Sequence, residues 1–447
     1  PAPAGDLADH REAVELAPGV HWIGALDPTL RSFDIILRTA NGTSYNAYLV
    51  RGETGVAVID TVKAGFADDF FARLESVARY DEIRVIVLNH LEPDHSGALP
   101  ELMRRAPQAR LYISTRAPGM LKALLKPHED QPLEFQTVGT GDEVDLGGRT
   151  LRFLHTPFLH WPDTQCTYLV EDGVLFSGDV FGCHHCDGRL FNDRCGDFRF
   201  AFDYYYAHIM RPFKTHVMKA LKLIEPLPLK IIAPTHGPIL RDRPRRYLTR
   251  YRELSSASFT ERLDSDQKTL IVFYMTSYGN TARMAEAIRA GAEEQSGVRV
   301  SLYDLEGGEL QPFVDLIESA DALVLGSPTI NGDAVKPIWD LLSSLAVIDL
   351  KGKLGAAFGS YGWTGEAVRM IEDRMRGLKM RVPLAGLRIK LIPTDEELET
   401  CRAFGRALAA AIQGTDTDRV VDLADLAEPD ATVRSITRSP QRPTTDN

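Results

Sequence analysis

The sequence predicts two domains of the α/β and α+β classes, joined by a linker. Up to about residue 234, short apolar runs typical of strands alternate with segments of helical periodicity. A second series of strands and helices begins at Thr269, and the stretch between the two series is rich in serine and charge, with little periodicity. We therefore expect a first domain at 1–254, a linker at 255–267, a second domain at 268–413 and a C-terminal tail at 414–447.

The elements of the first domain follow from its apolar runs in chain order. A strand pair with a charged turn comes first, and a helix and the strand before the richest polar motif come next. The expected elements are strands at 46–50 and 55–60, a helix at 66–79, a strand at 83–88, alternating segments at 100–105, 110–114 and 119–125, strands at 134–138, 150–155, 166–170 and 173–176, a long helix at 203–224 and a strand at 230–234.

The second domain opens with a continuous apolar run at 269–275, which is typical of a strand buried in a parallel sheet. Strands and helices then alternate to about residue 413. The tail is rich in Thr, Asp, Pro and Arg. We expect a short helix near 420–426 and disorder in the last fifteen residues.

Composition narrows the class of protein. The chain has 447 residues, of which 44% are hydrophobic and 25% charged, as in ordinary globular proteins. The net charge of −11 argues against a nucleic-acid partner, which needs a basic surface. No apolar run approaches the roughly 18 residues that cross a bilayer, and the N-terminus lacks the basic and apolar regions of a signal peptide. We expect a cytoplasmic protein with no membrane partner.

The segment His90-Leu91-Glu92-Pro93-Asp94-His95 holds four potential metal ligands directly after the strand at 83–88. Imidazole and carboxylate groups bind divalent metals of the iron–zinc group. Alternate residues of an extended turn point the same way, so His90, Glu92 and Asp94 are expected to converge, with His95 beside them. Two metals sharing this loop explain the density of ligands better than one metal. The alternative is a loop of solvated polar residues.

Three further candidate ligands, His160, Asp179 and His236, each follow an expected strand. A lone histidine after a strand is more often a hydrogen-bonded structural residue. Strand ends at one edge of a sandwich can converge, however, and the combination with the His90–His95 segment favours a metal site.

The five cysteines are too few, and odd in number, for a disulfide framework. Cys183-His184-His185-Cys186 has the C-x-x-C spacing of a zinc or redox site, but Cys195 alone would have to complete the sulfur ligands. A separate metal site there is the less favoured interpretation. Without a second C-x-x-C pair we also expect no fused rubredoxin module.

Three loops of the second domain follow apolar strands. The loop Thr276-Ser277-Tyr278-Gly279-Asn280-Thr281 precedes a helix expected to begin near Ala282, and its hydroxyl and backbone N–H groups suit a phosphate monoester. It lacks the G-K-[ST] ending of a Walker loop. Loops at 326–332 and 359–365 follow later strands. Ligands of such folds bind outside the carboxyl ends of the strands.

These motifs resemble known families. The metal motif resembles the metallo-β-lactamase superfamily, whose usual pattern is H-x-H-x-D-H, with Glu92 in place of the second histidine. That replacement, together with His160-Trp161-Pro162-Asp163 and Asp179, resembles the flavodiiron proteins, and the three loops resemble the FMN loops of flavodoxins. The resemblance covers about residues 10–412. It implies an N-terminal metallo-β-lactamase-like αββα sandwich followed by a flavodoxin-like doubly wound parallel sheet.

The resemblance also implies a set of site residues. His90, Glu92 and His160 would hold one iron, Asp94, His95 and His236 the other, and Asp179 would bridge them. His155 would support the site without binding metal, and His184 resembles a pocket histidine with a catalytic role. The implied FMN-binding residues are Thr276, Ser277, Tyr278, Gly279, Asn280, Thr281, Ser327, Pro328, Thr329, Ile330, Asn331, Ser360, Tyr361, Gly362 and Trp363. Tyr361 or Trp363 would stack on the flavin; ordinary surface packing is the alternative for each.

The implied activity is reduction of O2 to water, NO to N2O, or both, with two irons and FMN as cofactors. Reduced FMN carries two electrons and two ferrous irons carry one each, which matches the four electrons that O2 needs. The implied partners are a rubredoxin or similar small electron donor, or a deazaflavin, and a second copy in a head-to-tail homodimer or a dimer of dimers. Two alternatives remain: a dizinc hydrolase with a flavodoxin-like docking module, and a redox-inactive gas or flavin sensor.

An external donor would need a basic docking patch on an acidic protein. Two stretches are candidates, and the alternative for both is a solvated helix face. They are the cluster Arg369, Arg374, Arg376, Lys379 and Arg381, and the segment 241–252.

Overall fold

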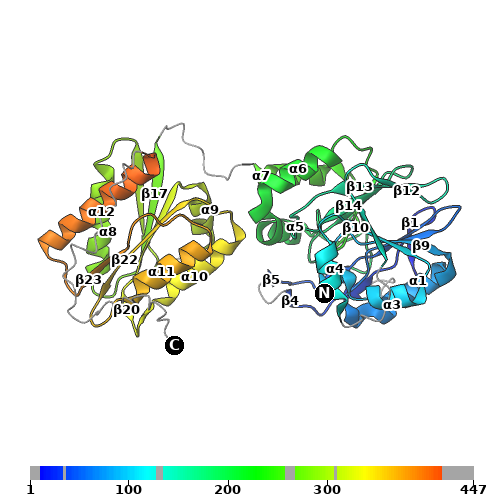
Figure 1. The fold of residues 1–447 in the computed structure, drawn as a ribbon, viewed down its shortest axis with the longest axis horizontal. Helices are drawn as coiled ribbons and strands as arrows, with labels where there is room; N and C mark the ends of the chain where they lie inside the picture. The colour runs from blue at the N-terminus through cyan, green and yellow to red at the C-terminus, as the bar shows by residue number, and fades with distance from the viewer. Residues whose placement is uncertain (1–10, 34–36, 127–133, 257–266, 307–309, 415–447) are drawn as a thin grey trace, which may run out of the picture. The chain divides into compact units, whose positions relative to one another are not determined.

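The computed structural model describes residues 11–33, 37–126, 134–256, 267–306 and 310–414. The chain forms two compact units, Pro1–Ala257 and Ser258–Asn447 (Figure 1). Most of the expected linker, the tail beyond Gly414 and the expected helix near 420–426 lie outside the described residues. Within the described ranges, no helix has both the length and the apolar character that crossing a membrane requires.

The first unit is built on two sheets. The larger has seven strands in the order β1-β2-β7-β8-β9-β10-β11, with bounds β1 Val14–Ala17, β2 Val20–Trp22, β7 Tyr48–Arg51, β8 Val56–Ile59, β9 Ile83–Val87, β10 Arg110–Ser114 and β11 Phe135–Val138. The smaller has five strands in the order β12-β13-β14-β15-β16, with bounds β12 Glu143–Asp145, β13 Thr150–His155, β14 Gln165–Leu169, β15 Val174–Gly178 and β16 Ile231–Pro234.

Two short strand pairs accompany these sheets: β3 (Ala25–Asp27) with β6 (Thr43–Tyr45), and β4 (Ser32–Phe33) with β5 (Leu37–Arg38). Helices cover the outer faces, with α1, α3 and α4 on one side and α5, α6 and α7 on the other (Figure 1). Their bounds are α1 Ala67–Val77, α2 Pro93–Ser96, α3 Leu99–Arg105, α4 Pro118–Leu124, α5 Arg199–Tyr205, α6 Lys214–Ile224 and α7 Arg245–Ser255, with 3₁₀ turns at Ala64–Phe66 and Tyr80–Glu82.

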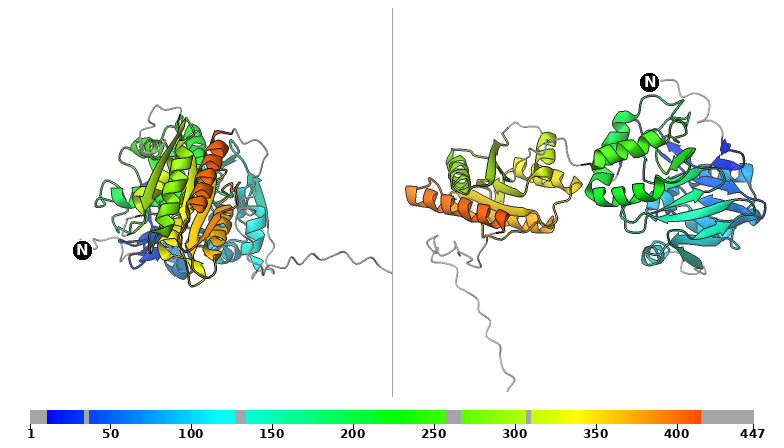
Figure 2. Two further views of the ribbon diagram at one scale, coloured as in Figure 1. Left: turned by 90° about the vertical axis from the view of Figure 1, so that its left-hand side faces the viewer. Right: turned by 90° about the horizontal axis from the view of Figure 1, so that it is seen from above.

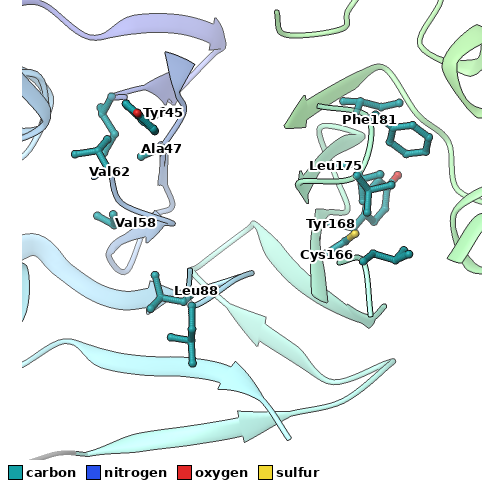
Figure 3. Close-up of a cluster of buried hydrophobic side chains, with 14 of the residues drawn as sticks. Tyr45, Ala47, Val58, Val62, Leu88, Cys166, Tyr168, Leu175 and Phe181 are labelled. Atoms are coloured by element: carbon teal, nitrogen blue, oxygen red, sulfur yellow. The ribbon is translucent and has the colours of Figure 1, made fainter. Parts of the chain in front are cut away.

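Alternation along β8 shows why this unit is a sandwich. Ala57 and Ile59 belong to the apolar core between the sheets, together with Phe153 and Phe176 of the smaller sheet. Val58, between them, belongs to the core beneath the helices. Figure 3 shows side chains of that outer core on strands of both sheets, including Val58 and Leu175. Central strands of both sheets, such as β8 and β15, are therefore buried on both faces, and the predicted αββα sandwich is confirmed.

One predicted element of this unit is wrong. The single helix expected at 203–224 is interrupted: α5 ends at Tyr205, a π-helical turn spans Tyr206–Met210 and a 3₁₀ turn spans Arg211–Phe213 before α6 begins. Pro212 lies in the 3₁₀ turn and has no N–H to donate, so a regular α-helix cannot run through it. The interruption also occurs beside the polar site described below, as π-turns often do.

The second unit has one five-stranded sheet in the order β18-β17-β19-β22-β23, with parallel pairing throughout. Its strands are β17 Lys268–Tyr274, β18 Val298–Asp304, β19 Ala322–Gly326, β22 Leu354–Tyr361 and β23 Leu387–Lys390, with a small hairpin of β20 Thr329–Ile330 and β21 Asp333–Ala334. Its helices are α8 Asn280–Glu293, α9 Gln311–Ser319, α10 Lys336–Ser344, α11 Glu366–Gly377 and α12 Asp395–Gln413.

Each face of this sheet has its own apolar core. One core combines the sheet with α8 and α12, the orange-red helix of Figure 2, and the other combines it with α9, α10 and α11. This strand order with helices on both faces is that of flavodoxins, so the predicted doubly wound sheet is confirmed. The first helix, α8, begins at Asn280, two residues earlier than expected.

Candidate metal and flavin sites

Strand direction brings the polar side chains of the first unit to one edge. β13 and β15 are both antiparallel to β14, and β16 is parallel to β15, so these three strands end on the same side. His160, Asp179 and His236 lie in the segments that follow them. β9 of the other sheet delivers His90 and Glu92 in the same way. The site therefore lies where the edges of the two sheets meet.

The seven predicted ligands fall into two groups. His90, Glu92, His160 and Asp179 form one, and Asp94, His95 and His236 form the other; within each group the potential ligand atoms lie within 4.8 Å of one another. Of the alternate residues His90, Glu92 and Asp94, the first two share a group and Asp94 belongs to the other. The short helix α2 begins at Pro93 and turns Asp94 and His95 toward the second group.

Asp179 lies between the two groups. Its Oδ2 is 3.4 Å from His160 Nε2 and 3.7 Å from His90 Nε2. Its Oδ1 is 3.1 Å from His95 Nε2 and 3.9 Å from His236 Nε2. The Thr235 hydroxyl donates to Oδ1 at 2.6 Å and fixes the orientation of the carboxylate. Each oxygen of Asp179 therefore faces a different group.

The second group has the features of a cation site. Asp94 Oδ1 is 3.3 Å from His95 Nε2, and Asp94 Oδ2 is 3.1 Å from His236 Nε2. Nevertheless both Asp94 oxygens and His95 Nε2 are buried without a hydrogen bond among the described residues. A buried polar atom left unpaired costs about 1–3 kcal/mol. The atoms point toward a shared position, which a metal ion would satisfy. Imidazole and carboxylate donors suit iron, zinc or manganese.

Hydrogen bonds behind the ligands orient two imidazoles. His90 Nδ1 lies 3.2 Å from Asp163 Oδ2, which also accepts the Leu91 N–H at 2.7 Å. His236 Nδ1 lies 2.8 Å from the Ser44 carbonyl oxygen. Such contacts place the proton on Nδ1 and leave Nε2 free for a metal.

The charged groups of the site shift the pKa values of one another, both of the histidines and of the carboxylates. Burial by itself would lower the pKa of each imidazole, but nearby carboxylates outweigh it. Asp163, Glu92 and Asp179 raise the pKa of His90 to about 10, Asp94 and Asp179 raise that of His95 to about 9, and Asp179 and Glu92 raise that of His160 to about 10. Conversely, burial opposes ionisation of Glu92 and Asp179, yet the imidazoles hold both carboxyl pKa values below their usual range.

His184 lies beside the second group. Its ring centroid is 4.9 Å from that of His236 and 4.3 Å from that of Phe33. Burial and the neighbouring His236 hold its pKa well below the usual range, so the ring is neutral. His155, expected to support the site, lies outside both groups, and its backbone N–H bonds to the Thr140 hydroxyl.

The cysteines form no part of either group. All five are free thiols. Burial raises the pKa of Cys186 and Cys195 to about 12, which leaves little thiolate at neutral pH.

Sequence reasoning missed several residues that support the site. Thr43 and Ser44 lie on β6, and Thr235 precedes His236. Tyr205, whose ring centroid is 5.0 Å from that of His184, lies at the end of α5. Asp163 was visible as part of the His160-Trp161-Pro162-Asp163 pattern, but its contact with His90 was not. The strands of residues 14–45 are too short to show periodicity.

The three predicted flavin loops lie at the carboxyl edge of the second sheet. The first runs from β17 to α8 and turns at Gly279, whose φ is +79°. The second is the β20–β21 hairpin, with Asn331 and Gly332 both at positive φ. The third follows β22. The hydroxyls of Thr281, in the first turn of α8, and Ser360, near the end of β22, are 2.9 Å apart and join the bases of the first and third loops.

Side chains of these loops fit a phosphorylated aromatic ligand. The Thr276 hydroxyl is buried without a hydrogen-bond partner in the described part of the chain. Tyr278 is 92% exposed and Trp363 is 89% exposed. A phosphate at the N-terminus of α8 would satisfy the hydroxyl, and a flat ring would cover the aromatic side chains.

The raised histidine pKa values predict a pH-dependent metal affinity. In the metal-free protein His90, His95 and His160 carry protons at neutral pH, and a metal must displace them. We expect the affinity for Fe²⁺ to rise with pH between about 6 and 9, measured anaerobically by chelator competition. The same shifts stabilise the metal-free fold below about pH 6.5, and this stabilisation is lost as pH rises through 9 to 10. An affinity indifferent to pH would contradict the assignment of these ligands.

Comparisons with known proteins match both units. A family model described as ODP family beta lactamase matches residues 43–237, and a flavodoxin model matches residues 272–405. The type A flavoprotein fprA of Rhodobacter capsulatus is 62% identical over 93% of this chain and 95% of its own length. The flavo-diiron protein FprA2 of Clostridium acetobutylicum is 36% identical over 90% of this chain and 100% of its own length.

Solved structures give the same result. The rubredoxin oxygen:oxidoreductase of Desulfovibrio gigas aligns with a TM-score of 0.62 and 27% identity, covering 90% of this chain and 99% of its own. The flavodiiron protein of Giardia intestinalis aligns with a TM-score of 0.60 and 30% identity, covering 90% and 97%. Together with the two-unit architecture and the paired ligand groups, these similarities show that the chain belongs to the flavodiiron protein family.

Proposed function

We propose that this chain reduces O2 to water, NO to N2O, or both, and that its electrons pass through FMN. As a flavodiiron protein it is an oxidoreductase with an FMN domain and a diiron centre. The observation that carries the proposal is the position of Asp179, with one oxygen toward each ligand group. A hydrolase with a flavodoxin-like docking module would leave the flavin loops without a role.

The residues of the site would bind and separate two cations. His90, Glu92 and His160 would hold one ion, and Asp94, His95 and His236 the other, while Asp179 would contribute an oxygen to each. Bound here, iron would supply the redox chemistry that a small gas needs. Three carboxylates offset the charge of the cations, and burial of six of the seven ligands limits access of water.

The loops of the second unit would hold FMN. Residues Thr276–Thr281 would surround its phosphate, and the loops with Ser327–Asn331 and Ser360–Trp363 would flank its ring system. Exposed Tyr278 and Trp363 would pack on the ring.

The names of relatives motivate a test of both gases. An anaerobic nitric oxide reductase flavorubredoxin of Pectobacterium carotovorum is 36% identical over 89% of this chain and 78% of its own length, and the Desulfovibrio gigas structure is that of an oxygen oxidoreductase. We therefore propose that each gas be presented to the same reduced protein, and that the ratio of the two rates define its substrate preference.

The function predicts that Asp179→Ala abolishes gas reduction while the fold survives. Without the carboxylate that both cations share, the two cations repel each other, so at least one of them should bind poorly. We expect native protein from iron-replete cells to hold about two irons and one FMN, and the variant to lose iron but keep FMN. Elemental analysis, flavin absorbance and a gas electrode measure these quantities.

Asp145→Ala, at an exposed position on β12, is the matched control and should behave as native. Native protein that holds two zinc ions and reduces neither gas would overturn the proposed function. An Asp179→Ala variant with full iron content and native turnover would show that Asp179 is not the bridge.

The two cofactor sites belong to different units of the chain, so electrons need a route between them. We propose a head-to-tail homodimer, or a dimer of such dimers, in which the flavin of one chain serves the irons of the other. Exposed large apolar side chains are candidate contacts. Among the described residues these are Phe200 on α5, and Tyr278, Ile330, Trp363, Met370, Leu391 and Ile392 in the second unit.

This arrangement predicts that Phe200→Glu weakens the dimer and slows reoxidation of reduced FMN by O2. Phe200 is 80% exposed, so the substitution should leave each unit folded. Sedimentation velocity and stopped-flow flavin absorbance measure the two effects. Gln136→Glu, at an exposed position on β11, is the control. A native monomer that reoxidises its flavin rapidly at all protein concentrations would refute the dimer.

The external donor would be a rubredoxin or similar small protein, with a deazaflavin as the alternative. Arginines in the segment 241–252 form ion pairs with acidic residues of the first unit: Arg241 pairs with Asp193, and Arg250 with Asp203. In the second cluster Arg376 pairs with Asp373, but Arg374 is exposed and has no ion pair among the described residues. The cluster at 369–381 therefore suits a docking partner better.

Donor docking predicts that Arg374→Glu slows oxidation of an acidic rubredoxin, and that added salt slows the native rate. The expected change is in the second-order rate constant, measured under pseudo-first-order conditions, because a surface charge acts mainly on association. Arg110→Glu, on β10 of the first unit, is the control. Equal rates for all three proteins at every ionic strength would contradict docking at this cluster.

A further inference from the structure

One asparagine holds the turn that carries His236. Asn46 lies between β6 and β7 and is fully buried. Its backbone N–H donates to the Thr235 carbonyl oxygen at 2.7 Å. Its side-chain Nδ2 donates to the carbonyl oxygens of Pro234 at 2.8 Å and Gly237 at 2.9 Å. All three N–H groups of Asn46 therefore bind the backbone on the two sides of His236.

The neighbours of Asn46 fix the orientation of its amide. Asn46 Oδ1 accepts the indole N–H of Trp22 at 2.9 Å, and an indole nitrogen can only donate. The carbonyl oxygens of Pro234 and Gly237 can only accept. A reversed amide would place its oxygen against two oxygens and its NH2 group against an N–H, so only one orientation satisfies these contacts. Arg73 lies over the Trp22 ring, 4.9 Å from its centre, and supports the indole from the other side.

The position of His236 depends on these bonds because the residue lies in a turn. β16 ends at Pro234, which has no N–H to donate, and Gly237 has a φ of +76°. The other two residues of the group, Asp94 and His95, lie on the helix α2. The separation of 3.1 Å between His236 Nε2 and Asp94 Oδ2 is thus set by how the turn is held relative to that helix.

Asn46 connects the two sheets at this place. It precedes β7 of the larger sheet, which also contains β9, the strand that leads to Asp94 and His95. The turn with His236 follows β16 of the smaller sheet. The bonds from Asn46 therefore tie the end of one sheet to the sheet that delivers the other two ligands.

We propose that Asn46 is a positioning residue for the second cation: its amide clamps the His236 turn to the larger sheet and so fixes the spacing of His236, Asp94 and His95. This inference rests on the proposed metal site, but not on reduction of either gas. The competing role for Asn46 is general support of the core, in which case its loss would affect both ion positions alike.

The clamp predicts a selective loss of affinity at one ion position. Asn46→Leu has a similar branched shape but no N–H donor, and the milder Asn46→Ser keeps one O–H donor, which can bind only one of the two carbonyls. Full-length protein loaded with FMN would be titrated with ¹¹³Cd²⁺ against a chelator, and ¹¹³Cd NMR would follow the two positions separately. We expect the affinity of the His236 position to fall about ten- to hundredfold, as for other hydrogen bonds behind metal ligands. The other position should keep its native affinity.

A matched control removes a different bond from the same turn. The Tyr48 hydroxyl donates to the Pro234 carbonyl oxygen at 2.6 Å, so Tyr48→Phe removes a buried hydrogen bond but leaves those of Asn46. We expect native affinity at both positions in this variant. His236→Ala and His160→Ala assign the two cadmium signals. An equal loss in Tyr48→Phe, or an equal loss at both positions in the Asn46 variants, would overturn the proposal.

Hydrogen exchange tests the clamp without any cation. In the metal-free protein, the backbone N–H groups of Thr235 and Gly237 should exchange faster in Asn46→Leu and Asn46→Ser than in native protein or Tyr48→Phe. Native exchange, or native affinity at the His236 position, in whichever Asn46 variants fold would overturn the clamp. If native iron protein reduces neither gas while the Asn46 variants still lose the second ion selectively, the proposed function fails and the clamp stands.

Discussion

The first unit depends on the interaction of one buried carboxylate with two sets of imidazoles. Asp179 is nearly inaccessible to solvent, and each of its oxygens faces a different set. A buried charge without compensation is strongly destabilising. In the metal-free protein protonated histidines supply the compensation, and bound cations would replace those protons. Asp179 and the histidines that offset its charge lie in different segments of the chain. The sandwich must therefore bring the ends of β9, β13, β15 and β16 to one place.

The scaffold meets that requirement through rigid supports behind the ligands. Asp60, at the end of β8, accepts the backbone N–H of Asn89 at 2.7 Å and its side-chain amide at 3.0 Å, so the loop that carries His90 leaves β9 in a fixed direction. Burial raises the pKa of Asp60 to about 6, although neighbouring histidines and Asn89 oppose the rise. The apolar core between the sheets keeps the strands in register beneath these contacts. The ligand positions are thus consequences of strand packing, and the short helix α2 then divides them into two groups.

The sequence allowed prediction of what depends on local pattern. Apolar runs such as 110–114 located strands, and the His90–His95 segment located the site, because ligand type and strand ends are visible along the chain. Contacts between residues far apart in the chain, and interruptions within a helix, could not be predicted from the sequence in this way. The helix at 203–224 looked continuous because its apolar periodicity survives the π and 3₁₀ turns around Pro212. Thr43 carried no signal, since a single threonine on a three-residue strand has no periodicity, and its contact with His184 spans 141 positions.

Each of the two units forms its own candidate site, and both sites lie at the carboxyl ends of strands. Each places polar or exposed aromatic groups at the carboxyl ends of its strands, where backbone N–H groups and loop side chains are not used by the sheet. In the first unit all ligands but the half-buried His160 are buried, and the group carries charge, which suits cations held in fixed positions. In the second, Tyr278 and Trp363 are almost fully exposed, which leaves both aromatic side chains available to pack on a flat ring. Because the cores of the two units share no residues, a substitution that disrupts one site should leave the other intact, and the loss of electron transfer can then be separated from loss of fold.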